Sequence, residues 1–170
     1  MKAIGLFSIF IALFMSCSKE PLIEMDREAF EREFAAWNEQ NIQNYQFSYE
    51  CNRARYSHYA KIAIEEGKEP ILMEPPDVPI ERVPYRSIAH LYEEINSYFE
   101  DIEKIKKRLG SYASNPVKSA TLHIEYDTQY HYPKKVLYAV HYINMSMIGI
   151  PPSVGGGHPI TEVTDFQPNE

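Results

Sequence analysis

The chain has 170 residues, of which 44% are hydrophobic and 13% aromatic, and it carries a formal net charge of −7. This length and composition suit one globular domain with a substantial core. The acidic balance and the lack of a basic stripe oppose binding to nucleic acid or to an anionic membrane surface. The sequence therefore predicts no nucleic-acid partner.

The first sixteen residues have the features of an export signal. Met1 and Lys2 form a minimal positive n-region, and Ala3–Met15 is almost wholly apolar. This run is shorter than the ~20 residues that a membrane-spanning helix needs. Its length and position are typical of a secretory signal peptide, which we assign to residues 1–16.

The four residues Phe14–Cys17 resemble the lipobox of bacterial lipoproteins, in which cleavage precedes a cysteine that is then lipidated. Ser16 fits the small residue of that box, while Phe14 and Met15 depart from its usual aliphatic and small positions. We expect a lipidated Cys17 and a tether over residues 17–25. Acyl chains would anchor the protein to a membrane of the bacterial cell envelope, facing the periplasm or the surface. An ordinary signal peptide or a short uncleaved anchor is the alternative.

The cysteine count agrees with this reading. The chain has two cysteines, so lipidation of Cys17 leaves Cys51 without a partner for an internal disulfide. Removal of residues 1–16, which include Lys2, leaves 24 acidic and 16 basic side chains and a formal charge of −8. An exported domain of this kind depends on its apolar core for stability.

After the tether, Asp26 is placed to cap a helix, and Phe30, Phe34 and Trp37 form one apolar stripe along it. The polar run from Asn38 to Asn44 ends this helix. The residues 45–51 alternate strictly between apolar and polar side chains and predict a strand. Residues 59–65 read as its partner and residues 71–73 as a third short strand.

Five prolines between Pro70 and Pro84 predict an extended surface connection, because each removes a backbone donor. Ser87 then caps a long helix that ends at Gly110. Its apolar positions keep helical spacing throughout: Ile88, Leu91, Ile95, Tyr98, Phe99, Ile102, Ile105 and Leu109. Basic residues crowd its last turns, where the helix dipole favours cations.

The period-2 pattern of residues 119–126 and 134–143, on either side of a turn with Asp127 and Pro133, predicts a β-hairpin. Pairing of residues of equal parity creates one large apolar face. The residues of this face are Ala120, Leu122, Ile124, Tyr126, Val136, Tyr138, Val140 and Tyr142. Residues 160–166 predict a last strand.

This order of elements lacks regular βαβ alternation and predicts an α+β fold. We expect an antiparallel β-sheet of five or six strands, covered by an N-terminal helix and one long central helix. Residues 26–167 form the single domain, and residues 168–170 a polar tail.

The chain resembles a family of bacterial exported proteins and lipoproteins classed as a domain of unknown function. The resemblance runs from Trp37 to Phe166. It rests on short aromatic motifs: Trp37, Asn44–Tyr49 with Cys51, Tyr126-Asp127 through Tyr132-Pro133, and Val163–Phe166. Members commonly have glycine where this chain has His131. They often carry a second cysteine close to the first, and Asn52-Arg53 stand there instead, which leaves a redox or disulfide role without its second thiol. The resemblance implies location and fold and gives no activity.

No catalytic signature is present, and the sequence predicts no catalytic residue and no cofactor. The most interesting constellation is His123, Glu125 and His141, which share the outer face of the hairpin by parity. A register with His123 opposite His141 would place two imidazoles and a carboxylate together, a set that could hold zinc. The alternative is an ordinary polar outer face.

Cys51 has two interpretations as well. Nearby cations could lower the pKa of its thiol and make it reactive. Its parity with Tyr45, Phe47 and Tyr49 favours a small buried hydrophobic residue.

An apolar segment rich in Gly and Pro, from Met145 to Pro159, is a candidate contact loop because exposed methionines adapt to partners. Its key residues are Met145, Met147, Ile148, Ile150 and Gly156. Simple packing of the loop over the sheet is the alternative. We expect a membrane-tethered binding or interaction module with an envelope protein as partner. The alternatives are an enzyme with an unrecognised site, metal-dependent or otherwise, and an inhibitor of a secreted hydrolase.

Overall fold

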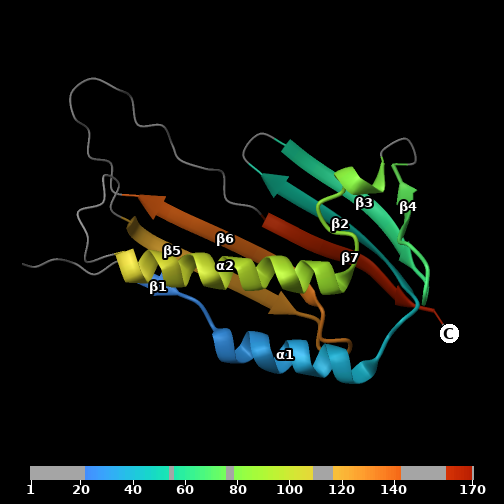
Figure 1. The fold of residues 1–170 in the computed structure, drawn as a ribbon, viewed down its shortest axis with the longest axis horizontal. Helices are drawn as coiled ribbons and strands as arrows, with labels where there is room; N and C mark the ends of the chain where they lie inside the picture. Colours follow the sequence, from blue (N-terminus) through green and yellow to red (C-terminus); the bar gives the residue numbers. More distant parts are fainter. Residues whose placement is uncertain (1–21, 54–55, 76–78, 109–116, 143–159, 170) are drawn as a thin grey trace, which may run out of the picture.

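Two layers make up the protein: a seven-stranded sheet and two helices that pack on one of its faces (Figure 1). The computed structural model describes residues 22–53, 56–75, 79–108, 117–142 and 160–169. The α+β class predicted from the sequence is confirmed. Within the described ranges, neither helix combines the length and the apolar character that crossing a bilayer requires.

The elements alternate along the chain without a repeating unit. The strands are β1 (Leu22–Glu24), β2 (Tyr45–Arg53), β3 (Tyr56–Ile64), β4 (Ile71–Glu74), β5 (Val117–Tyr126), β6 (Pro133–Tyr142) and β7 (Ile160–Pro168). The helices are α1 (Arg27–Gln40), the short 3₁₀ turn η1 (Ile80–Arg82) and α2 (Ile88–Arg108).

The strand order is β1-β5-β6-β7-β2-β3-β4, and all neighbours are antiparallel except the parallel pair of β1 and β5. The prediction of five or six antiparallel strands was therefore wrong in detail, because the sheet is mixed and has seven. The missed strand is β1, which lies inside the predicted tether over residues 17–25. Three residues are too few to show the alternation that identifies a strand.

The predicted hairpin is confirmed as β5 and β6. Leu122 lies opposite Tyr138 and Ile124 opposite Val136, so residues of equal parity do share a face. The register shifts at each end of the hairpin, between Val117 and Ser119 and between Glu125 and Tyr126. The two helices cover this apolar face. Phe30 of α1 and Phe99 of α2 are both buried, and their ring centroids are 5.0 Å apart.

The strand motif of residues 45–51 fixes the start of α2. Tyr45, Phe47, Tyr49 and Cys51 all point into the core. The Tyr45 hydroxyl accepts a hydrogen bond from the backbone N–H of Ile88 (3.2 Å), the first residue of α2. The Tyr49 hydroxyl accepts from the N–H of Tyr85 (3.3 Å). Two tyrosines of one strand thus satisfy the N–H of the first residue of α2, which lacks an acceptor within the helix, and the N–H of Tyr85 just before it.

Both predicted helix caps are present. An Asp26 carboxylate oxygen accepts from the N–H of Ala29 (2.8 Å), and the Ser87 hydroxyl accepts from the N–H of His90 (3.0 Å).

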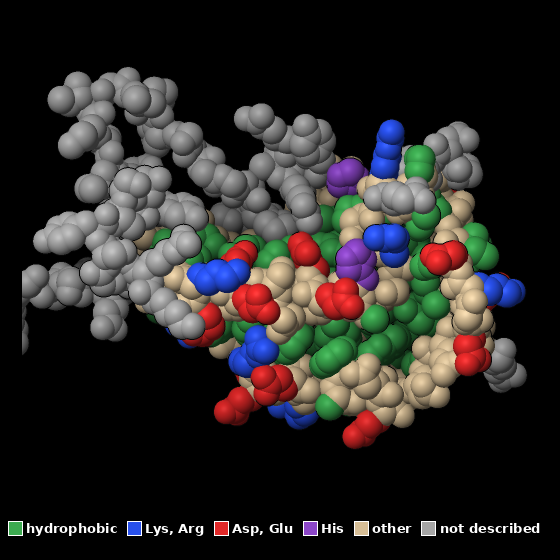
Figure 2. Space-filling view, viewed as in Figure 1, with side chains coloured by type: hydrophobic (Ala, Val, Ile, Leu, Met, Phe, Trp, Pro, Cys, Tyr) green, Lys and Arg blue, Asp and Glu red, His purple; other side chains and the backbone are tan. Residues whose placement is uncertain are grey.

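The buried apolar stripe on α1 is narrower than predicted, since Phe30 and Trp37 are buried but Phe34 is 37% exposed. Charged side chains of both signs are interspersed on the face shown in Figure 2.

The proline-rich connection is only partly a surface segment. Its end turns inward, and Val83 is buried together with Tyr85, the residue after Pro84. The prediction of an exposed connection was wrong here, because the pattern of prolines indicates the backbone conformation and gives no information on which intervening side chains reach the core.

Replacing Tyr45 by Phe should destabilise the protein by about 1.5 kcal/mol, because the buried N–H of Ile88 loses its acceptor. Urea unfolding measures this free energy. Tyr59→Phe is the matched control: the Tyr59 ring is 48% exposed, so we expect a change within about 0.5 kcal/mol. Equal effects of the two substitutions would contradict the capping role.

Candidate functional site

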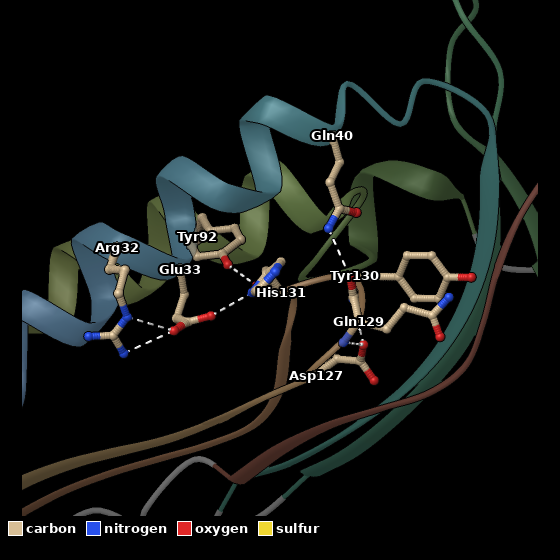
Figure 3. Close-up of polar contacts among 8 residues, drawn as sticks. All are labelled: Arg32, Glu33, Gln40, Tyr92, Asp127, Gln129, Tyr130 and His131. Carbon is tan, nitrogen blue, oxygen red and sulfur yellow. Dashed lines mark hydrogen bonds and ion pairs between the residues drawn. The ribbon is translucent and has the colours of Figure 1, made fainter.

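The most connected polar cluster of the described residues is built on the turn between β5 and β6 (Figure 3). The Asp127 carboxylate accepts hydrogen bonds from the N–H groups of Gln129 (2.9 Å) and Tyr130 (2.7 Å). The N–H of His131 donates to the carbonyl of Asp127 (3.1 Å). His131 has a φ of 60°, in the left-handed region that glycine adopts most easily. A non-glycine residue with this conformation needs compensating contacts.

Both helices supply such contacts to the turn. His131 Nδ1 lies 2.8 Å from a carboxylate oxygen of Glu33 on α1, and the Tyr92 hydroxyl of α2 donates to the His131 carbonyl. The amide of Gln40, the last residue of α1, donates to the carbonyl of Gln129 (2.8 Å). Sequence reasoning missed this cluster. The one available signal was His131, a non-glycine residue in a tight turn beside Asp127 and Pro133.

Glu33 is charged in this cluster. Burial by itself opposes the charge, but hydrogen bonds from His131 and Arg32, with the positive charge of Arg32, lower the pKa of Glu33 below its usual value of 4.5. The Arg32 guanidinium lies 2.9 Å from the other Glu33 oxygen. Both carboxylate oxygens are therefore engaged.

A carboxylate that holds one imidazole nitrogen is a geometry that also occurs in catalytic triads. Catalysis of that kind needs a nucleophile beside the second nitrogen. In the part of the chain that the structure describes, Glu33 is the side chain that binds the His131 ring, and the Tyr92 hydroxyl binds the backbone. We therefore interpret the Glu33–His131 pair as a structural contact that holds the turn against the helices.

The expected register of the His123, Glu125 and His141 constellation is wrong. His123 lies opposite Leu137 and His141 opposite Ser119, so the two histidines are offset by four positions along the hairpin. The turn between Tyr126 and Pro133 sets the register, and the bulge beside Tyr126 changes it by one residue. His123 Nε2 lies 3.7 Å from a Glu125 oxygen on the exposed face. The described residues include no group of three His, Cys, Asp or Glu that could hold a metal.

Cys51 is buried in β2, in agreement with its parity. Its sulfur lies 3.9 Å from the Tyr85 hydroxyl, which is 3.1 Å from the Thr161 hydroxyl. These three side chains form a small polar contact between the sheet and the segment that precedes α2. A reactive thiol needs solvent access, which Cys51 lacks.

Two further predictions fall outside the described residues. Cys17 belongs to residues 1–21, and the contact loop lies within residues 143–159. The predictions for Cys17, Met145, Met147, Ile148, Ile150 and Gly156 therefore remain predictions.

Two hollows mark the edges of the sheet. The first, of about 220 Å³, is lined by Tyr49, Ser57, His58, Tyr59, Ala60, Pro75, Arg82, Val83 and Pro84. The second, of about 210 Å³, is lined by Asp26, Ala29, Leu122, His123, Ile124 and Tyr126. Both are small for a pocket that encloses a cofactor or drug-sized ligand, which typically has ~300–1,000 Å³.

Each hollow lies where a short edge strand stops. β1 pairs with β5 only at Ser119–Thr121, and β4 pairs with β3 only at Lys61–Ala63. The hollows are lined by the next residues of β5 and β3, at 122–126 and 57–60. Among the described residues, these two stretches have a strand partner on one side only.

Searches with protein-family models, curated proteins and solved structures found no match to this chain.

Replacing Glu33 by Gln should lower the stability at pH 7 by about 1 kcal/mol, because a charged hydrogen bond to His131 is lost. A carboxyl whose pKa is lowered by folding stabilises the protein above its usual value of 4.5, and this contribution disappears as the pH falls through the folded value. The difference between the two proteins should therefore shrink below pH 4.5.

Chemical unfolding at pH 7, 5 and 3 measures this difference. Glu31→Gln is the matched control, because Glu31 pairs with Arg27 on the exposed side of the same helix. A Glu33→Gln effect that stays constant across this pH range would contradict the assignment of a charged, hydrogen-bonded Glu33.

Proposed function

We propose that this protein is a bacterial cell-envelope lipoprotein, anchored by acyl chains on Cys17, that acts as a binding module for another envelope protein. The anchor follows from the signal-like N-terminus. The described domain supports a binding role because its hollows lie on open strand edges. Small surface hollows with exposed backbone groups suit recognition of a polypeptide better than chemistry on a small substrate.

The open edges are the observation that carries the proposal. An edge strand presents unpaired N–H and C=O groups, and a partner chain can add to it as a further strand. The two edge strands, β1 and β4, have three and four residues. Among the described residues, each pairs with only three residues of its longer neighbour, which has ten residues in β5 and nine in β3. Short edge strands usually protect a sheet against pairing, and here they leave two specific stretches available instead.

The β3–β4 side also exposes apolar side chains. Ile71 and Met73 of β4 are 48% and 42% exposed, and Tyr59 of β3 is 48% exposed. Alternation places Ile71 and Met73 on the same face of the strand. Pro70 and Pro75 flank β4 and limit how far a partner could pair along it. We propose this patch, together with the Met145–Pro159 loop, as a contact surface.

The Cys17→Ser variant should lose incorporation of an alkyne-labelled fatty acid in growing cells and should leave the membrane fraction. Cys51→Ser is the control and should remain labelled, because the buried thiol is not the acylation site. Gel fluorescence after click labelling measures both. Equal labelling of the Cys17→Ser variant would contradict the anchor.

Chemical crosslinking of the full-length protein in its native envelope, followed by mass spectrometry, tests the binding role. A specific partner should be captured, and capture should fall at least several-fold when Ile71 and Met73 are both replaced by Asp, or when residues 145–157 become a Gly/Ser linker. Leu22→Asp is the control, since Leu22 is an exposed apolar residue on the opposite edge strand. Loss of capture in the control alone would contradict the proposed surface.

A further inference from the structure

The second hollow is a groove between α1 and the open edge of β5. Leu122 and Ile124 point to the helical layer, whereas His123 points to the opposite face of the sheet. Because its lining residues come from both faces of β5, this hollow must lie at the edge of the strand. Asp26 and Ala29, from the cap and first turn of α1, form the other wall.

The open edge beside the groove is long enough for an extended segment. The five residues 122–126 of β5 extend over about 17 Å at ~3.4 Å per residue. The hollow itself, of about 210 Å³, holds only about seven waters at ~30 Å³ each, so it takes a short part of such a segment while the rest lies along the strand edge. Ala29 adds only a methyl group to the helical wall, so the wall is not filled by a long side chain. A strand added beside β5 would continue the sheet where β1 leaves it at Glu24.

One lining residue of the groove has a buried polar atom without a partner. The Tyr126 hydroxyl is the one buried side-chain nitrogen or oxygen without a hydrogen bond in the described part of the chain. Burial first, and then the nearby Glu33 and Asp26 carboxylates, raise the pKa of Tyr126, so its hydroxyl keeps its proton and can donate. An unsatisfied buried hydroxyl costs about 1–3 kcal/mol, and a ligand carbonyl can recover this cost only if the side chains that close over the hydroxyl move.

The rim of the groove is acidic. Asp26 is the carboxylate among the lining residues, and one of its oxygens caps α1. Glu125 points to the other face of the sheet, opposite Lys135 of β6, and does not line the groove. Arg32 lies near Tyr126, and Glu33 already binds its guanidinium. Arg27 is paired with Glu31 and lies over the rings of Phe30 and Phe99. The charge that this rim accepts from a ligand is therefore positive.

We infer that the groove between α1 and the open edge of β5 binds an extended peptide segment that carries a lysine or arginine side chain, added as a strand beside Leu122–Tyr126. Backbone groups of β5 hold its main chain, and Asp26 holds its cationic side chain. This inference rests on the proposed function and names a site and a partner chemistry for it.

Selection from a phage library of random decapeptides on the full chain in mild detergent tests the inference. Phage that also bind the Ala29→Phe variant are removed, because a phenyl ring fills the groove. We expect enriched peptides to alternate apolar and polar residues and to carry Lys or Arg. Ala35→Phe, on an exposed position of the same helix, is the matched control and should keep binding.

Two measurements on an enriched peptide do not depend on the Ala29→Phe variant. Asp26→Asn preserves a capping side chain and removes its charge. It should weaken binding about threefold in fluorescence anisotropy, whereas exchange of the peptide's Lys for Glu should weaken it about tenfold. Hydrogen exchange should slow at residues 122–126 when the peptide binds, as strand addition requires.

No enrichment over the Ala29→Phe variant, enrichment of acidic or uncharged peptides, or no slowing at residues 122–126 would each overturn the inference. A partner that is captured in cells through the β4 patch while the groove selects nothing would leave the proposed binding role standing and remove this site from it. Failure of both experiments would remove the binding role itself.

Discussion

The fold depends on covering one apolar sheet face with only two helices. That face runs across the strands from β5 to β3, and its side chains are mainly aromatic and β-branched. Tyrosines dominate its polar part. The hydroxyls of Tyr45 and Tyr49 bind the N–H groups of Ile88 and Tyr85, and the Tyr92 hydroxyl binds the carbonyl of His131. A phenol contributes a large apolar surface and one hydrogen bond, so it can fill the core and fix a chain end together.

These hydrogen bonds hold α2, and α2 in turn positions the hairpin turn. His131 is kept in its left-handed conformation by contacts from both helices, with Glu33 on one side and Tyr92 on the other. The turn therefore joins the helical layer to the sheet. This explains why the most connected polar cluster of the described chain has a structural role.

The two edges of the sheet differ from its core in how completely the strands are paired. β1 and β4 are short, so the backbone of β5 and β3 is only partly paired on its outer side. Both hollows lie on these stretches, one with Arg82 on its wall and the other with Asp26. The charge of the two edges thus differs in sign at these residues, and the two edges are suited to different partners.

Alternating patterns predicted the long elements, because a strand or helix of nine or more residues repeats its period several times. Residues 45–51 and the β5–β6 hairpin were placed correctly for this reason, as was the cap at Asp26. β1 was missed because its three residues show no period. The register of His123 and His141 was wrong because the turn between Tyr126 and Pro133 sets it, and side-chain alternation fixes only which face a residue is on. The Glu33–His131 pair joins residues 98 positions apart, which local patterns do not connect.

The most direct test of the account places a photo-crosslinking amino acid, benzoylphenylalanine, at single positions in growing cells. His123 and Ser57 lie on the two open edges, and Glu162 lies on the exposed side of β7, which is paired on both sides. The account predicts a discrete crosslinked partner from at least one edge position and none from Glu162. A partner captured from Glu162 and from neither edge would contradict the claim that this domain binds through its open strand edges.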